Sequence, residues 1–237
     1  MTLKIKIYLV LFVVLSTAGR LAAQKGKDFQ SSTFSNKIKV DGKLNDWQGI
    51  SFHFDKNTLL HYAVANDEKN LYLSIKKDKN PSKIFNGGIT FFIMKGNSPK
   101  LENAILLTYP VTNTGNKGNI DLGIIKVSSI SGITDSLISV NNEFGIRIEL
   151  KSETVDSKLC TCLEMAIPLD IVRDYLDANN ISFGIRLNGT PHRSNRGAEL
   201  MASSRPIGTQ SRENMEMLHD ISVPSEFFTT FQIANKP

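Results

Sequence analysis

The segment 38–77 constrains the fold more than any other part of this chain. It opens with IKVDGKLNDWQ, in which an Asp-Gly turn, Asp41-Gly42, precedes Trp47, the one tryptophan in the sequence. Two stretches, 62–64 and 71–75, then follow a period-two pattern, and the polar run 66–70 between them has the composition of a turn. Such alternation predicts half-buried strands joined as a hairpin.

The same pattern continues along most of the chain. Further strands are predicted at 89–94, 104–111, 120–130, 144–150, 159–167, 181–187 and 227–233. Pro168 suits the first turn of a short helix that ends at Asn179-Asn180. The segment 190–225 contains three prolines and breaks the pattern, although 210–218 fits a short helix. The sequence predicts an all-β protein: a single jelly-roll-like β-sandwich with one or two short helices and a long C-terminal loop.

The N-terminus has the layout of a secretory signal peptide. Lys4 and Lys6 precede an apolar run at 7–15, and small residues follow up to Ala23. The run is shorter than the roughly 20 residues of a spanning helix, and the alternative is an N-terminal anchoring helix. We expect residues 1–23 to be a signal peptide, 24–36 a polar linker and 37–237 the β-sandwich domain, in a periplasmic or secreted protein that does not span a membrane.

Charge gives little support to nucleic-acid binding. Removal of residues 1–23 takes away three basic residues and no acidic one, so the 28 basic and 23 acidic residues of the whole chain become 25 and 23. No stripe of Lys and Arg follows one predicted face, which a nucleic-acid-binding surface would require.

The opening motif resembles the start of the family-9 carbohydrate-binding modules and their relatives. VDGKLNDW at 40–47 and YAVANDEKNLYLSI at 62–75 carry the resemblance, and EMAIPL at 164–169 and ISFGIRLNG at 181–189 are similar to later parts of that family. Together these motifs extend over most of the chain after the signal peptide. The resemblance implies a jelly-roll-like sandwich and a binding role without catalysis.

Members of that family clamp a sugar between aromatic side chains, often tryptophans. The one tryptophan here lies beside a turn, where a large indole usually packs into the fold. Tyrosines on predicted strands are the remaining candidates for stacking on a sugar, in particular Tyr62 and Tyr109, although strand tyrosines also pack across strands.

A second group of candidate ligand-binding residues surrounds the long loop. Guanidinium groups hold carboxylates or phosphates with paired hydrogen bonds, and long loops in compact domains often carry function. The alternative is a solvated loop. The candidates are Arg186 and Asn188 on the strand that leads into the loop, and His192, Arg193, Arg196 and Arg205 within it.

No signature of an enzyme or of a metal site is present in the sequence. The H-E-x-x-H, G-x-S-x-G, P-loop and Rossmann patterns are absent. Asp41, Asp46 and Asp67 offer oxygen atoms to a structural calcium ion, but without EF-hand spacing. Cys160 and Cys162 are expected on one strand face, where neighbours two residues apart diverge for bridging, and an intermolecular bridge is the alternative.

Two functions follow as hypotheses. The first is an exported, non-catalytic module that binds a glycan or cell-surface polymer and needs no cofactor. The second is a structural or assembly protein of the envelope that binds another protein through the basic loop. An unrecognised enzyme has the least support, because no nucleophile, base and orienting group can be assembled.

Overall fold

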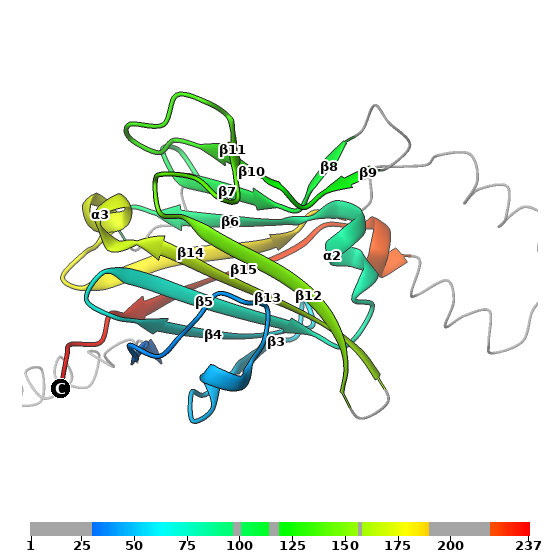
Figure 1. The fold of residues 1–237 in the computed structure, drawn as a ribbon, viewed down its shortest axis with the longest axis horizontal. Coiled ribbons are helices and arrows are strands. Elements are labelled where there is room, and N and C mark those ends of the chain that lie inside the picture. Colours follow the sequence, from blue (N-terminus) through cyan, green and yellow to red (C-terminus); the bar gives the residue numbers. More distant parts are fainter. Residues whose placement is uncertain (1–29, 97–100, 114–118, 156–157, 190–218) are drawn as a thin grey trace, which may run out of the picture.

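The computed structural model describes residues 30–96, 101–113, 119–155, 158–189 and 219–237, which form two packed β-sheets (Figure 1). Within these residues the first sheet has seven strands, in the order β1 (Gln30–Ser31), β15 (Ser225–Gln232), β14 (Asn180–Leu187), β6 (Ile89–Met94), β7 (Ile105–Tyr109), β10 (Ile124–Ser128) and β11 (Leu137–Ser139). The second sheet has the order β12 (Arg147–Val155), β13 (Lys158–Pro168), β5 (Asn70–Lys77), β4 (Leu60–Asn66) and β2 (Thr33–Phe34), and β3 (His53–Asp55) pairs with β4.

Short elements complete the described structure. The strands β8 (Val111–Asn113) and β9 (Asn119–Asp121) form a separate hairpin. The helices are η1 (Asn45–Trp47), α2 (Ser82–Gly87), α3 (Leu169–Val172) and η2 (Arg173–Tyr175), and residues 219–222 form a further helical turn. In Figure 1, α3 lies at one end of the sandwich and α2 at the other. None of the helices in the described ranges is long and apolar enough to cross a bilayer.

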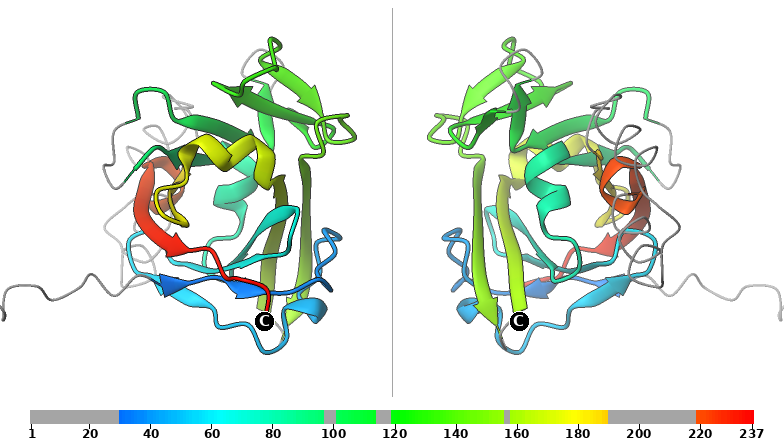
Figure 2. Two further views of the ribbon diagram at one scale, coloured as in Figure 1. Left: turned by 90° about the vertical axis from the view of Figure 1, so that its left-hand side faces the viewer. Right: turned by 90° about the vertical axis from the view of Figure 1, so that its right-hand side faces the viewer.

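The core lies between the sheets, as period-two alternation requires. On β14 the inward side chains are Ile181, Phe183, Ile185 and Leu187, and all four are buried in the main hydrophobic cluster. End-on views show the two sheets surrounding this core (Figure 2). The predicted all-β sandwich is therefore confirmed.

The strand β6 is buried on both faces, as expected for an apolar run in the middle of a sheet. It pairs with β14 on one side and β7 on the other. Its inward residues join the main core, whereas Phe92 and Met94 belong to a smaller cluster on the outer face.

Several regions differ from the sequence expectations, and β3, α2 and β11 were not predicted at all. Residues 30–34, expected in a linker, form β1 and β2, which pair in parallel with β15 and β4. Ser32 lies between these two strands, and its hydroxyl bonds the Asn66 side chain, which gives a polar segment a place in the fold. The predicted strand 120–130 is divided between β9 and β10, because the chain bends after Asp121, whose carboxylate accepts from the Gly123 N–H.

The opening motif covers the outer face of the second sheet. Trp47 is 2% exposed and packs with Ile38, Ala63, Ala65 and Tyr72. Trp47 is therefore a packing residue that closes a second, smaller core.

A buried carboxylate anchors this motif to the sheet. Glu164, which is fully buried on β13, accepts hydrogen bonds from the backbone N–H groups of Asp41 and Gly42 at 2.9 and 2.6 Å. Its other oxygen accepts from Trp47 Nε1 at 2.5 Å. Gly42 has a positive φ of 76°, a conformation that glycine adopts without strain. Burial raises the pKa of Glu164, and the three donors partly offset that effect.

Candidate functional site

The outer face of the first sheet carries two parallel rows of side chains. Strand register places one residue from each of β15, β14, β6, β7 and β10 side by side in each row. The polar row is Glu226, Arg186, Thr90, Thr108 and Lys126, and the apolar row is Phe228, Gly184, Phe92, Leu106 and Ser128. The two rows lie two residues apart along each strand, so they share one face of the sheet.

Two aromatic rings and an ion pair lie together at the end of the rows formed by β15, β14 and β6. The Arg186 guanidinium lies 4.9 Å above the Phe92 ring centroid, and its Nε donates to Glu226 at 2.5 Å. Phe228 lies across Gly184, where an added Cβ would come within 2.4 Å of the ring. Because Phe228 is 38% exposed while Phe92 is buried, Phe228 offers the open aromatic surface of this pair.

A hollow of about 410 Å³ adjoins the polar row. It is lined by Arg186, Asn188, Pro224, Ser225 and Glu226. Asn188 is held in place because its oxygen accepts from Thr90 Oγ1 at 3.0 Å and its amide donates to the Gly87 carbonyl at 3.1 Å. The hollow therefore has fixed polar walls beside an exposed aromatic ring.

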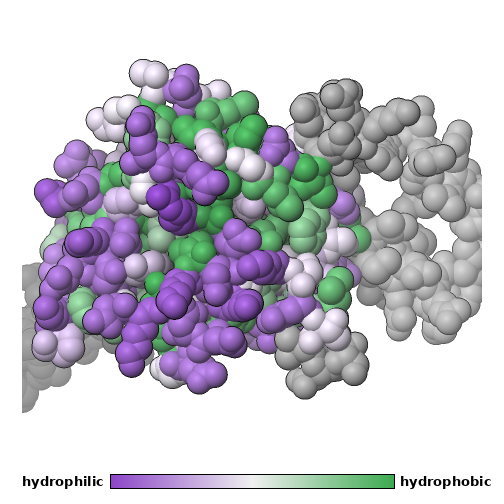
Figure 3. All heavy atoms as spheres, viewed as in Figure 1, coloured by the Kyte–Doolittle hydropathy of each residue, from purple (hydrophilic) through white to green (hydrophobic). Residues whose placement is uncertain are grey.

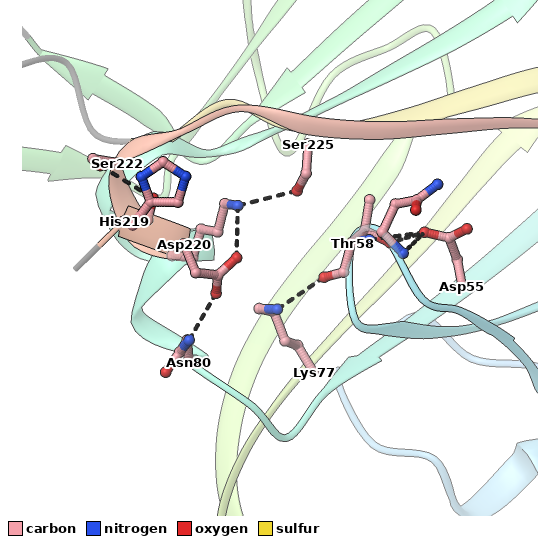
Figure 4. A network of polar contacts seen from close by, with 10 residues as sticks. Asp55, Thr58, Lys77, Asn80, His219, Asp220, Ser222 and Ser225 are labelled. Carbon is pink, nitrogen blue, oxygen red and sulfur yellow. Dashed lines mark hydrogen bonds and ion pairs between the residues drawn. The ribbon is translucent and has the colours of Figure 1, made fainter. Parts of the chain in front are cut away.

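Two buried lysines, Lys77 and Lys83, lie close to the hollow, because Lys83 contacts Ser225 in its wall. Figure 4 shows Lys77 in the same polar network as Asn80, Asp220 and Ser225. Lys83 is 1% exposed, and its Nζ donates to Ser225 Oγ at 3.0 Å and to Asp220 at 3.2 Å. Asp220 also accepts from Asn80 at 2.7 Å. Burial alone would raise the pKa of Asp220, but the hydrogen bonds from Asn80 and Lys83 and the nearby lysine charges lower it.

Lys77 is fully buried beside this pair, and its Nζ donates to the Thr58 carbonyl at 2.9 Å. Burial lowers the pKa of Lys77 to about 8, and the Lys83 charge acts in the same direction, whereas Asp220 opposes it. This part of the fold therefore holds two ammonium groups near one paired carboxylate, an arrangement that costs stability at neutral pH.

The lowered pKa of Lys77 makes the free energy of unfolding depend on pH in the alkaline range. Between pH 8 and the ordinary lysine pKa of 10.5, the unfolded chain keeps a proton that the folded chain has lost. Stability contributed at this site therefore rises with pH across that window. Lys77→Met has no such group. From pH 8 to pH 10.5 we therefore expect the unfolding free energy of the natural chain to rise, relative to that of Lys77→Met, by on the order of 2 kcal/mol.

Urea denaturation at several pH values measures this difference, and a difference that stays flat or falls above pH 8 would contradict the assignment. Lys79→Met, at an exposed neighbouring lysine, is the control, and it is expected to change the unfolding free energy little at any pH.

The structure brings together only part of the predicted site. Arg186 and Asn188 line one hollow, as their place on the polar side of the strand suggested. His192, Arg193, Arg196 and Arg205 lie outside the described residues, as does the expected helix at 210–218. Sequence reasoning missed Phe228 and Glu226, although their alternation with Phe227 on the last strand was a usable signal.

The two candidate tyrosines lie inside the sandwich. Tyr62 is 5% exposed and packs against Phe227, with ring centroids 4.7 Å apart. Tyr109 is 3% exposed, and its hydroxyl donates to the Leu122 carbonyl at 3.1 Å. Burial raises the pKa of Tyr109 to about 12. Neither ring has an open face, so we leave both out of the candidate site.

The cysteines lie on the face opposite the main core, as expected. Both thiols are free and buried, with their Sγ atoms 3.8 Å apart. Burial raises the pKa of both thiols, which disfavours the reactive thiolate. Among the described residues, no group of three or more His, Cys, Asp or Glu side chains is placed to hold a metal ion.

Comparison with known proteins gives a likeness of fold. Two solved structures of a family-9 carbohydrate-binding module from Caldicellulosiruptor kristjanssonii, one in complex with glucose and one with cellotriose, are similar to this chain. The TM-scores are 0.43 and 0.41, the identities 11% and 8%, and each match covers 88% of this chain and 96% or 95% of the other. Both solved structures are of a member of the family that the opening motif resembles. No family model and no curated protein sequence matches the chain.

Proposed function

We propose that this chain is an exported, non-catalytic module that binds a glycan or similar cell-surface polymer on the outer face of the first sheet. The single observation that carries the proposal is the pairing of the polar and apolar rows, with Phe228 exposed beside the Arg186–Glu226 pair. A sugar ring has an apolar C–H face and a rim of hydroxyl groups. An aromatic ring beside fixed charged and amide groups offers partners for both.

The chemistry of the two rows favours binding over cleavage. Glycoside hydrolysis ordinarily needs two carboxyl groups about 5–10 Å apart on either side of the bond. In the two rows Glu226 is the single carboxylate, and Arg186 engages it. The signal-like segment 1–23 supports export.

Phe228→Ala tests the site. Loss of the exposed ring removes the stacking surface, and we expect about a tenfold loss of affinity for the polysaccharide that the natural chain binds, a change of about 1.4 kcal/mol. Affinity gel electrophoresis against a panel of soluble polysaccharides measures the effect.

The matched control is Phe54→Ala. Phe54 is 54% exposed on β3, which belongs to the second sheet, and its ring contacts His61. This variant is expected to migrate like the natural chain. Equal retardation of both variants would place the binding surface elsewhere, and retention by an envelope protein with no polysaccharide affinity would favour the alternative assembly role.

A further inference from the structure

A second hollow, of about 900 Å³, lies at the end of the sandwich that carries α3. In Figure 1 this end is opposite α2, the helix whose sequence includes Lys83. Its walls come from three segments that are distant in sequence: the connection before β7, the connection after β10, and α3 with η2.

One phenol joins these three walls. The Tyr175 hydroxyl donates to the Asn103 carbonyl at 3.0 Å and makes a weaker contact with the Ser129 carbonyl at 3.4 Å. Asn103 and Ser129 both have a positive φ, 63° and 62°, which is uncommon for residues other than glycine. The hollow is thus formed by packed and hydrogen-bonded walls, so a ligand would enter a pre-formed site.

The lining combines hydroxyl, charged and aliphatic groups. Ser129 and Ser131 supply hydroxyls, Asp174 and Lys95 supply opposite charges, and Ile171 supplies an apolar surface. Asp170 also faces the hollow, but Arg173 engages it. A carboxylate accepts and an ammonium donates hydrogen bonds, so together they suit vicinal hydroxyl groups.

The charged residues that line the second hollow indicate what charge its ligand can carry. Two carboxylates and one ammonium line the hollow, and Arg173 pairs with the carboxylate of Asp170, so no excess of either charge favours an ionic ligand. A volume of this size is at the upper end of the range for small-molecule sites. These features suit an uncharged, polyhydroxylated ring.

We propose that this second hollow, which Tyr175 and its neighbours line, is a second binding site, for a neutral sugar unit. The glycan class rests on the proposed function. The site itself shares no residue with the two rows, and it adjoins them only where Ser128, the last residue of the apolar row, precedes Ser129. With two sites on one chain, a polymer that reached both would be held by both at once and so more tightly than by either alone.

Isothermal titration of the full chain with neutral gluco-, xylo- and manno-oligosaccharides tests the proposal. Ser131→Trp fills the hollow from an exposed position, and Ser136→Trp, at an exposed serine in the same connection, is the control. We expect two classes of site in the natural chain. Ser131→Trp should weaken one class about tenfold or more, Phe228→Ala the other, and Ser136→Trp neither. Asp174→Asn should weaken the same class as Ser131→Trp.

The outcomes separate the two proposals. If Phe228→Ala abolishes all binding and Ser131→Trp changes none, the second site is overturned and the first remains. If Ser131→Trp abolishes all binding and Phe228→Ala changes none, the first site is overturned and the second remains. If no neutral oligosaccharide binds the natural chain, the second site is overturned.

Discussion

Replacing Asp220 with alanine is expected to destabilise the protein by about 3 kcal/mol, because it leaves the buried Lys83 ammonium without its carboxylate partner. The Lys83 side chain is 1% exposed, so solvent does not replace the lost oxygen. Ser225 remains as an acceptor, but a neutral hydroxyl does not compensate a buried charge. Chemical denaturation monitored by circular dichroism measures the loss.

A double variant distinguishes the ion pair from general disruption. Lys83→Met with Asp220→Ala removes both charges, and replacing a buried pair with apolar groups is often close to neutral. We expect the double variant to be more stable than Asp220→Ala alone. Asp170→Ala removes an exposed partner of Arg173 and should cost at most about 0.5 kcal/mol. If the double variant is no more stable than the single one, Lys83 does not carry the penalty.

Replacing Glu164 with glutamine is expected to cost about 2–3 kcal/mol, because an amide cannot accept from both sides. Glutamine has one carbonyl oxygen, so its NH₂ group must face either Trp47 Nε1 or the two backbone donors of Asp41 and Gly42. Denaturation midpoints measure the overall loss. Trp47 is the only tryptophan in the chain, so its fluorescence reports on the opening segment, and we expect a red shift as the indole gains contact with water.

Glu149→Gln is the matched control for this change. Glu149 lies directly opposite Glu164 on β12, but its side chain is 44% exposed and its partner is the exposed Lys151. The same substitution there should leave both stability and emission nearly unchanged. An unaltered Trp47 spectrum in Glu164→Gln would show that the carboxylate does not hold the opening motif.

Short-range patterning was enough to predict most of the fold. The alternation on β14 identified its inward face, and the Asp-Gly turn with Trp47 identified a packed corner. The anchor of that corner could not be predicted, because Glu164 is 122 residues from Gly42 and no local pattern links them. The contact joins a strand side chain to a turn outside the sheet, so it depends on tertiary packing that one sequence does not display.

The site was predicted less well than the fold, for a related reason. Arg186 and Asn188 could be placed on one surface because they lie on the polar side of a clearly alternating strand, and their role in binding stays a prediction. Nothing in the sequence indicated that Lys77 and Lys83 are buried, because lysine is almost never fully buried without a partner. The partners are distant in sequence: Thr58 is 19 residues from Lys77, and Asp220 is 137 residues from Lys83. Tyr62 and Tyr109 were candidates for exposed stacking rings. Side chains alternate between the two faces of a strand, and both tyrosines lie on the face that packs into the main core.

The short strands β1 and β2 have a consequence for biogenesis. β1 pairs with β15 near the end of the chain, and Ser32 contacts the Gln232 carbonyl across 200 residues of sequence. A nascent polypeptide cannot complete this edge until its last strand has been synthesised, and contacts between such distant segments form slowly. For the exported role proposed above, a precursor that stays open until β15 has been synthesised would also stay competent for translocation.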